Sequence, residues 1–410
     1  MRRVEVVSRG DLKVFLKEIP WVETTAIAFL VRVGSANEGD SQAGVSHFLE
    51  HVVFRGTQKY SMRELKYTVE SVGGTLNAFT TTRSTIYYAR VPAFQAEKAL
   101  DVLKELVFHP KIGEEGVEIE RRVILEEIRM SLENPEDRLF RMAMMSVWGS
   151  PYGRDTLGSE ETVSRMRADD IKEYHRNRYI PPRIRVIVTG KFDRNLLDVL
   201  DDPHPAEDFE DPPEPAFRHN EDTKLQTMKD INHVHVLLLK EGLGKMTEDY
   251  EKLLVLDTIL GSGMSSYLFE EIREKLGTVY EIYSFPVSLK SAGAYGIYFS
   301  TSPENAFKTL DAVVEALKRF KASDHHEYGI KRRLGKLMMT LESPAGYLNY
   351  IVDRATYSDE VEDPKELEKR IESISPEELE EFSKRFLKGK WSVFAVAPEG
   401  FSWDVAGVEI

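Results

Sequence analysis

The spacing of apolar residues in the first half of the chain predicts a mixture of strands and helices. Residues 12–16 alternate between apolar and polar positions, and residues 24–33 are mostly β-branched or apolar, as in strands. Ser61 and Glu64 form the sequence pattern of a capping box, which begins a predicted helix that runs to about Val72. Further strands are predicted at 75–80, 85–91 and 183–190, and further helices at 96–108, at 114–133 and, after a break at 134–137, up to Trp148.

The second half of the chain repeats this pattern after an acidic, proline-rich stretch. Residues 201–222 contain five prolines among acidic residues, which predicts an exposed and stiff linker. A strand at 234–239 and helices at 249–260 and 267–276 follow. Three pairs of short segments match at an offset of about 210 residues: 129–135 with 338–344, 100–101 with 310–311, and 91–92 with 302–303. We therefore predict two homologous α+β domains, 1–200 and 223–410, each with an antiparallel-rich sheet covered by helices.

Three ionisable residues interrupt an otherwise apolar helical segment at 44–57. His47 and His51 lie one turn apart, and Glu50 lies on the same side of the helix. Ionisable groups on a buried helix are costly unless they are paired or bind a metal, and His-x-x-Glu-His is the inverzincin spacing. Two core histidines hydrogen-bonded to Glu50 are the structural alternative. The second half has no counterpart of this motif.

The helix predicted at 114–133 offers two acidic side chains on its apolar side. Glu120 and Glu127 lie two turns apart, beside Val123, Ile124 and Ile128, whereas Arg122, Glu126, Arg129 and Glu133 form a stripe of alternating charge typical of a solvated face. Catalytic zinc sites use three protein ligands, so Glu127 is the candidate third ligand and Glu120 a partner that orients a histidine. Alternatively, both carboxylates pair with Arg121 or Arg122.

Composition narrows the classes of function. The chain has 410 residues, a formal net charge of −14 and 41% apolar residues, which disfavours nucleic-acid and anionic-membrane binding and supports well-packed cores. It has no cysteine, so any metal must be held by histidine and carboxylate. It has neither an apolar run long enough to span a membrane nor the apolar core of a signal peptide at its start, so we expect a cytoplasmic protein.

Four segments resemble the pitrilysin/insulinase family of inverted zinc metallopeptidases, and most closely its smaller members of the mitochondrial-processing-peptidase type. They are residues 47–57, 73–80, 120–128 and 268–280, and the resemblance extends over nearly the whole chain. It implies one Zn²⁺ per chain on His47, His51 and Glu127, with Glu120 in the surrounding shell. Glu50 would be the general base that activates water.

The same resemblance implies further roles. Arg273 would hold the substrate, and Tyr280 would donate a hydrogen bond to the developing oxyanion. The strand at 76–80 would bind an extended peptide by edge addition, with contacts at Asn77, Ala78 and Phe79. Many relatives have glutamate where this chain has Arg83, a difference that would change how substrate side chains are received.

The implied activity is that of a zinc-dependent endopeptidase or oligopeptidase acting on extended or unfolded peptides. Long-chain relatives enclose the substrate between two halves, so a chain of this length would form a dimeric chamber, as a homodimer or as a heterodimer with a related subunit. Arg273 and Tyr280 would then act on the zinc site of the partner subunit. Two alternatives remain open: a non-catalytic scaffold subunit with this fold, and a maturation protease dedicated to one partner.

Overall fold

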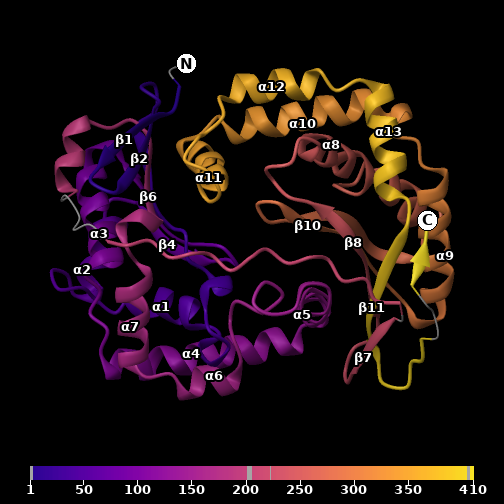
Figure 1. The fold of residues 1–410 in the computed structure, drawn as a ribbon, viewed down its shortest axis with the longest axis horizontal. Helices are drawn as coiled ribbons and strands as arrows, with labels where there is room; N and C mark the ends of the chain where they lie inside the picture. Colours follow the sequence, from indigo (N-terminus) through magenta and orange to yellow (C-terminus); the bar gives the residue numbers. More distant parts are fainter. Residues whose placement is uncertain (1–2, 201–205, 222, 404–406) are drawn as a thin grey trace. The chain divides into compact units, whose positions relative to one another are not determined.

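Two compact units make up the molecule, in a computed structural model that describes residues 3–200, 206–221, 223–403 and 407–410 (Figure 1). The first unit comprises Met1–Arg129, Arg154–Pro212 and Leu337–Asp363. The second comprises Met130–Gly153, Pro213–Lys336 and Pro364–Ile410. Two of the boundaries fall within long helices, α4 (Glu114–Glu133) and α10 (His326–Thr340).

A six-stranded sheet forms the centre of the first unit. Its strands are β1 (Glu5–Arg9), β2 (Leu12–Glu18), β3 (Thr24–Val31), β4 (Thr75–Thr80), β5 (Thr85–Pro92) and β6 (Ile184–Gly190), in the order β1-β2-β6-β3-β5-β4. The β2–β6 pair is parallel and the others are antiparallel. Every residue of β6 is buried, as are all but the first of β3, so both faces of the sheet are covered. β4 is an edge strand.

Helices cover the two faces of this sheet. They are α1 (Val45–Val53), α2 (Met62–Glu70), α3 (Ala96–Phe108), α6 (Glu160–Arg165), α7 (Ala168–Arg178) and α11 (Pro344–Ala355), together with most of α4. The Phe29 ring of β3 lies 6.2 Å from that of Phe108 at the end of α3, whereas the Thr189 hydroxyl of β6 donates to the Pro344 carbonyl of α11 at 2.7 Å. Thr189 is paired with Ala26 of β3, so the two side chains lie on the same face of the sheet. Ala26 and Phe29 are three residues apart on β3, so their side chains lie on opposite faces. Helices α3 and α11 therefore cover opposite faces of the sheet.

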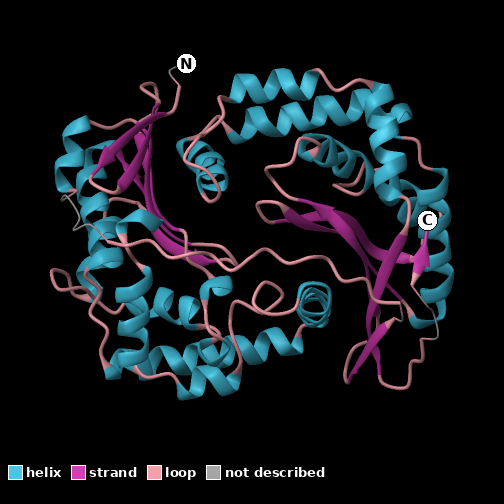
Figure 2. Ribbon diagram, in the orientation of Figure 1, coloured by secondary structure: helices cyan, strands magenta, loops and turns pink. Residues whose placement is uncertain are grey.

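The second unit repeats this topology. Its strands are β7 (Lys224–Met228), β8 (Val234–Leu243), β9 (Val279–Ser288), β10 (Ala292–Thr301), β11 (Lys390–Pro398) and β12 (Val408–Glu409). β7 pairs in parallel with β11, and the order β7-β11-β8-β10-β9 reproduces β2-β6-β3-β5-β4 of the first unit. The strands of both units are drawn in magenta in Figure 2. The predicted α+β fold with two homologous halves is confirmed.

The helices of the second unit are α5 (Pro135–Trp148), α8 (Tyr250–Leu260), α9 (Ala306–Arg319), α12 (Pro364–Glu372) and α13 (Pro376–Leu387), together with most of α10. Two of them, α5 and α8, agree with the sequence prediction, and a third predicted segment differs from it. Residues Phe269–Glu274, predicted as part of an α-helix, form a π-helix in which Lys275 N–H bonds to the Glu270 carbonyl. Apolar periodicity cannot distinguish these two helix types over six residues. Short 3₁₀ turns lie at Ser35–Asn37, Asp40–Gln42, Ala93–Gln95, Pro181–Arg183, Arg194–Val199, Pro303–Asn305 and Ala322–His325.

Each unit takes one helix from the other half of the sequence. α11 packs in the first unit against β3 and β6, and α5 packs in the second against β8 and β11 (Figure 1). In the second unit the Phe140 ring of α5 lies 5.1 Å from Phe285, and the Tyr283 hydroxyl donates to Glu136 at 2.6 Å. The compact units therefore differ from the contiguous domains predicted from the sequence, 1–200 and 223–410 with a linker at 201–222. The reason is that α5 and α11 each bury their apolar face on the sheet formed by the other half of the sequence.

The repeated segments 129–135 and 338–344 lead into these exchanged helices. Asn134 caps α5 by accepting from the Glu136 and Asp137 amides, and Ser343 caps α11 by accepting from the Gly346 amide. In both helices a proline follows the cap, at the first helical position. The repeated segments thus mark the two points at which the chain passes from one compact unit to the other.

The acidic linker is partly held against the first unit. Residues 206–221 form no helix or strand, and 201–205 and 222 lie outside the described residues. Asp211 accepts from Arg83, Arg183 and Asn37 at 2.7 to 2.9 Å. These contacts correct the expectation of a wholly exposed spacer. In the described part of the chain, no helix is long and apolar enough to cross a membrane.

Candidate metal centre

Helix α1 carries the His-x-x-Glu-His motif into the interior of the first unit. Its apolar residues are buried all the way round, and it contacts β4, β5 and α7. The helix begins at Gly44, whose φ of 91° is in the left-handed region. A Cβ at Gly44 would lie 2.6 Å from the Leu157 carbonyl oxygen, so a larger residue would displace the start of α1.

Three potential ligand atoms converge beside α1. The Nε2 atoms of His47 and His51 each lie 3.7 Å from Oε2 of Glu127, which α4 contributes. The three donor atoms lie within 4.8 Å of one another, and no other group of three such residues is found among the described residues. The side chains of His47 and His51 are 13% and 19% exposed and that of Glu127 is 38% exposed, so the group is accessible from the carboxylate side.

This donor set fits a zinc ion. Ligand atoms about 2.0–2.1 Å from zinc at tetrahedral angles lie roughly 3.4 Å apart, close to the two histidine–carboxylate distances of 3.7 Å. Two imidazoles and one carboxylate are a ligand set of catalytic zinc sites, which keep a fourth position for water. Burial and the neighbouring His51 lower the pKa of His47 to about 3, so this imidazole is neutral at pH 7, as a metal ligand must be.

A carboxylate on the far side of His51 fixes the orientation of its ring. Nδ1 of His51 lies 3.0 Å from Oε2 of Glu120, and the Arg55 guanidinium donates to the other oxygen of Glu120. With the His51 proton on Nδ1, Nε2 is free to bind a metal. Burial opposes ionisation of Glu120, but the hydrogen bond from His51 and the charge of Arg55 together hold its pKa below the usual range.

Glu50 lies on the same helix and makes a different contact. The Thr80 hydroxyl, at the end of β4, donates to Oε2 of Glu50 at 2.6 Å. Burial raises the pKa of Glu50, against opposing effects of Thr80 and His51. A buried carboxylate with a raised pKa beside a metal site is suited to accepting and returning a proton.

The edge strand β4 presents alternate residues to two sides. Ala78, opposite Tyr87 of β5, is 9% exposed, whereas Phe79 is 44% exposed and lies 6.2 Å from the Tyr88 ring. The Asn77 side-chain oxygen accepts from the Ala78 amide at 2.8 Å. This contact satisfies a backbone donor on the edge strand that a substrate carbonyl could otherwise bind.

Comparison with known proteins agrees with this geometry. A profile of the family described as Insulinase (Peptidase family M16) matches residues 13–160, and one described as Peptidase M16 inactive domain matches residues 165–332. A protein of Mycobacterium tuberculosis named as an uncharacterized zinc protease is 30% identical over 404 residues, which cover 95% of this chain and 92% of the relative. The chain belongs to peptidase family M16.

Two further proteins extend the comparison. A protein of Mycobacterium leprae named as an uncharacterized zinc protease is 34% identical over 316 residues, covering 75% of this chain and 71% of the relative. The crystal structure of a protease from Helicobacter pylori superimposes with a TM-score of 0.88, covering 97% of this chain and 100% of that one. Its sequence identity is 19%, so this likeness establishes the shared fold alone.

Arg273 and Tyr280 lie in the second unit, within the part of the chain that matches the M16 inactive-domain profile. Arg273 projects from the π-helix, with its guanidinium 4.7 Å from the centre of the Phe269 ring. Tyr280 is the second residue of β9, the edge strand equivalent to β4, and is 75% exposed. Both side chains are thus on the surface of their unit, available for contacts outside it.

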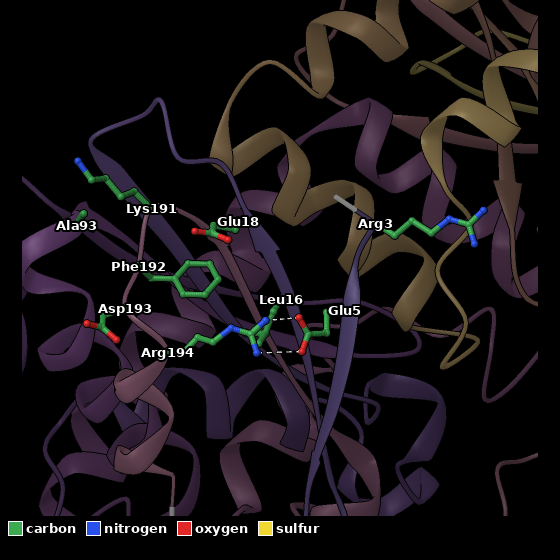
Figure 3. Close-up of a pocket in the computed structure, with 9 residues that line it drawn as sticks. All are labelled: Arg3, Glu5, Leu16, Glu18, Ala93, Lys191, Phe192, Asp193 and Arg194. Atoms are coloured by element: carbon green, nitrogen blue, oxygen red, sulfur yellow. Dashed lines mark hydrogen bonds and ion pairs between the residues drawn. The ribbon is translucent and has the colours of Figure 1, made fainter. Parts of the chain in front are cut away.

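A cavity of about 600 Å³ in the first unit is a separate feature (Figure 3). None of the three candidate metal ligands lines it. Its wall includes the Arg194 guanidinium, which faces the Glu5 carboxylate and donates to it. The lining residues are Arg3, Glu5, Leu16, Glu18, Ala93, Lys191, Phe192, Asp193 and Arg194. Because acidic and basic side chains are balanced there, the lining does not select one class of ligand.

The structure gives the hydrogen-bond partners of the candidate carboxylates and adds two residues to the site. Glu120 bonds to His51 and Arg55 rather than to Arg121, which pairs with Glu118, and Glu50 bonds to Thr80 rather than to a histidine. Arg55 lies four residues after His51, in the turn that follows the end of α1 at Val53, and this short separation could have indicated it from the sequence. Nothing in the sequence pairs Thr80 with Glu50, since that contact depends on how β4 packs against α1.

Proposed function

We propose that this M16 protein is a zinc-dependent endopeptidase or oligopeptidase that hydrolyses extended or unfolded peptides. The observation that carries the proposal is the convergence of the His47, His51 and Glu127 donor atoms beside the buried carboxylate of Glu50. The names of the relatives as zinc proteases support the same activity.

His47, His51 and Glu127 would hold one Zn²⁺ per chain. A bound zinc ion lowers the pKa of a water molecule toward ~7 and polarises a peptide carbonyl. Glu50 would accept the proton from the attacking water and deliver it to the nitrogen of the leaving amine. Thr80 would hold the Glu50 carboxylate in place for both transfers, and Glu120 would keep the His51 ring in its ligating orientation.

The substrate would bind as an additional strand along β4. Main-chain hydrogen bonds to an edge strand give affinity with little dependence on sequence, which suits an oligopeptidase. The Ala78 amide would exchange its bond with the Asn77 side chain for one with a substrate carbonyl, and the exposed Phe79 would contact substrate side chains. Arg83 donates to Asp211, so its charge is already compensated within the unit.

Arg273 and Tyr280 would complete the reaction from the second unit. Tyr280 would donate to the substrate carbonyl oxygen as negative charge develops on it, and Arg273 would hold the substrate main chain. We propose that two chains form a homodimeric chamber, in which this pair serves the zinc site of the partner subunit. The surface position of both side chains is consistent with that arrangement. A heterodimer with a related subunit would use the same residues.

Two alternatives make different predictions. A scaffold subunit would need neither the ligand set nor Glu50, although both are present in this chain. A maturation protease dedicated to one partner would use the same chemistry but cleave few peptides. Mapping of cleavage products from a mixed peptide library by mass spectrometry distinguishes them. We expect many products that vanish with a chelator and return with zinc. Products from a single sequence would indicate the dedicated protease, and the absence of any would indicate the scaffold.

A further inference from the structure

A buried carboxylate outside the ligand set anchors the start of the zinc-binding helix. Glu38 is 6% exposed and lies in the loop between β3 and α1. Its Oε2 accepts from the Gly44 amide at 2.8 Å and its Oε1 accepts from the Ser46 amide at 2.9 Å. Both oxygens therefore bond to the first turn of α1, and the residue after Ser46 is His47.

No side chain of α1 itself performs this role. Gly44 occupies the N-cap position and has no side chain, so the free amides at the start of α1 need an acceptor from elsewhere. Water cannot easily supply it, because Val45 and Ser46 are completely buried. A negatively charged acceptor is further stabilised by the positive end of the helix dipole.

The loop that carries Glu38 is itself held in place. Arg154 donates to the carbonyl oxygens of Ser35 and Glu38 at 3.1 and 2.9 Å, and its side chain is 8% exposed. The Ser35 and Ala36 amides bond to the carbonyls of residues 81 and 82, just beyond β4. The loop that carries Glu38 thus connects α1 to the segment that follows Thr80, the residue bonded to Glu50.

We propose that Glu38 is a positioning residue for the metal centre, an inference that rests on the proposed zinc site. Its two bonds would fix the first turn of α1 and so set the distance from His47 to Glu127. His51 has a dedicated partner in Glu120, whereas Nδ1 of His47 is buried and has no hydrogen-bond partner among the described residues. His47 is therefore placed by its helix, and Glu38 fixes the end of that helix nearest to it.

Substitution of Glu38 tests this role through zinc affinity. Glu38→Gln replaces one acceptor oxygen by an amide group that would face a backbone N–H and cannot accept from it, while Glu38→Asp keeps the carboxyl group but is too short to reach both amides. Zinc affinity is measured by competition with a chromophoric chelator, together with thermal unfolding and hydrogen exchange of the Ser46 amide in metal-free protein. We expect zinc binding to weaken roughly 10- to 100-fold in Glu38→Gln, with faster Ser46 exchange, and to weaken less in Glu38→Asp.

Ser61→Ala is the matched control. Ser61 caps α2, which carries no metal ligand, so its loss should lower the unfolding temperature and leave zinc affinity unchanged. Wild-type zinc affinity in both folded Glu38 variants would overturn the positioning role, and so would failure of both to fold, which would make the cap purely structural. A wild-type protein that binds no zinc would instead refute the proposed function, and this inference with it.

Discussion

The two units contain equivalent carboxylates in different settings. In each unit, a helix follows the second strand of the repeated sheet. A carboxylate on that helix accepts a hydrogen bond from a hydroxyl group on the edge strand. Glu50 of α1 accepts from Thr80 of β4, and Asp257 of α8 accepts from Ser284 of β9 at 2.6 Å. Asp257 also accepts from the Tyr295 hydroxyl at 3.2 Å.

The difference lies in the positions around the carboxylate. The residues three before and one after Glu50 are His47 and His51, whereas the same positions around Asp257 are Leu254 and Thr258. Without the two imidazoles, this helix of the second unit has no histidine ligands for a metal ion. Asp257 instead accepts its hydrogen bonds from two hydroxyl groups of its own unit. The comparison teaches that both units place a carboxylate against a hydroxyl of the edge strand, while the proposed metal chemistry depends on two histidines present in only one unit.

Removal of the third ligand should have the largest effect on metal binding. We expect Glu127→Gln to weaken zinc binding more than about 100-fold, beyond the loss typical of an outer-shell change. Glu126→Gln is the matched control, because Glu126 pairs with Arg129 on the exposed face of the same helix. Metal analysis after dialysis against buffered zinc measures both. Equal zinc content in the two variants would exclude Glu127 as a ligand.

The edge-strand hydroxyls should differ in their effect on catalysis. Thr80→Val removes a hydrogen bond to Glu50, and hydrogen bonds to charged groups contribute about 1.5–3 kcal/mol, so we expect kcat to fall roughly 10- to 100-fold. Ser284→Ala, at the equivalent contact in the second unit, should leave kcat unchanged. Comparable losses in both variants would show that the two carboxylates are not functionally distinct.

Complementation tests whether the second unit serves a partner's zinc site. Glu50→Gln and Tyr280→Phe should each be inactive alone. If the pair acts across a homodimer, each mixed dimer has one intact site, so random mixing of equal amounts restores about a quarter of wild-type activity. No recovery, with mixed dimers shown to form by native mass spectrometry, would contradict action in the partner.

The pH dependence of stability should reveal Asp257. Burial raises its pKa to about 6, above the unfolded-state value, so the folded chain binds more protons between about pH 4 and pH 6. The stability that this group contributes is complete below the unfolded pKa and is lost as the pH rises through 6. We expect a loss of up to about 3 kcal/mol in the free energy of unfolding over this range.

Denaturant titrations of the wild type and Asp257→Asn at pH 4 and pH 7.5 measure this contribution. The variant should lack this part of the pH dependence, because its amide does not titrate. An identical pH dependence in the two proteins would show that Asp257 titrates normally in the folded state.

Much of this molecule follows from local sequence. Apolar spacing predicts β4, α3 and α4 to the residue, and the Ser61 capping box predicts the start of α2. The metal-ligand candidates follow from the face that each side chain occupies on its helix. Their grouping in the structure agrees with that prediction, because spacing along a helix fixes direction as well as position.

The remaining features depend on contacts between distant segments. The exchange of α5 and α11 could not be predicted from the linker composition, because either sheet could have buried the apolar faces of these helices. The Thr80–Glu50 bond and the capping of α1 by Glu38 join residues 30 and 6–8 positions apart in the sequence through tertiary packing. The π-helix at Phe269–Glu274 likewise has no periodicity that separates it from an α-helix over so short a segment.

The most direct test compares the same chemical change at the two equivalent carboxylates. Peptide turnover and bound zinc are measured on the same samples of wild type, Glu50→Gln and Asp257→Asn. We predict that Glu50→Gln retains zinc but loses at least about 100-fold in kcat, as expected for a lost general base, and that Asp257→Asn retains both zinc and activity. Undiminished turnover in Glu50→Gln, or its loss in Asp257→Asn alone, would contradict the assignment of the chemistry to the first unit.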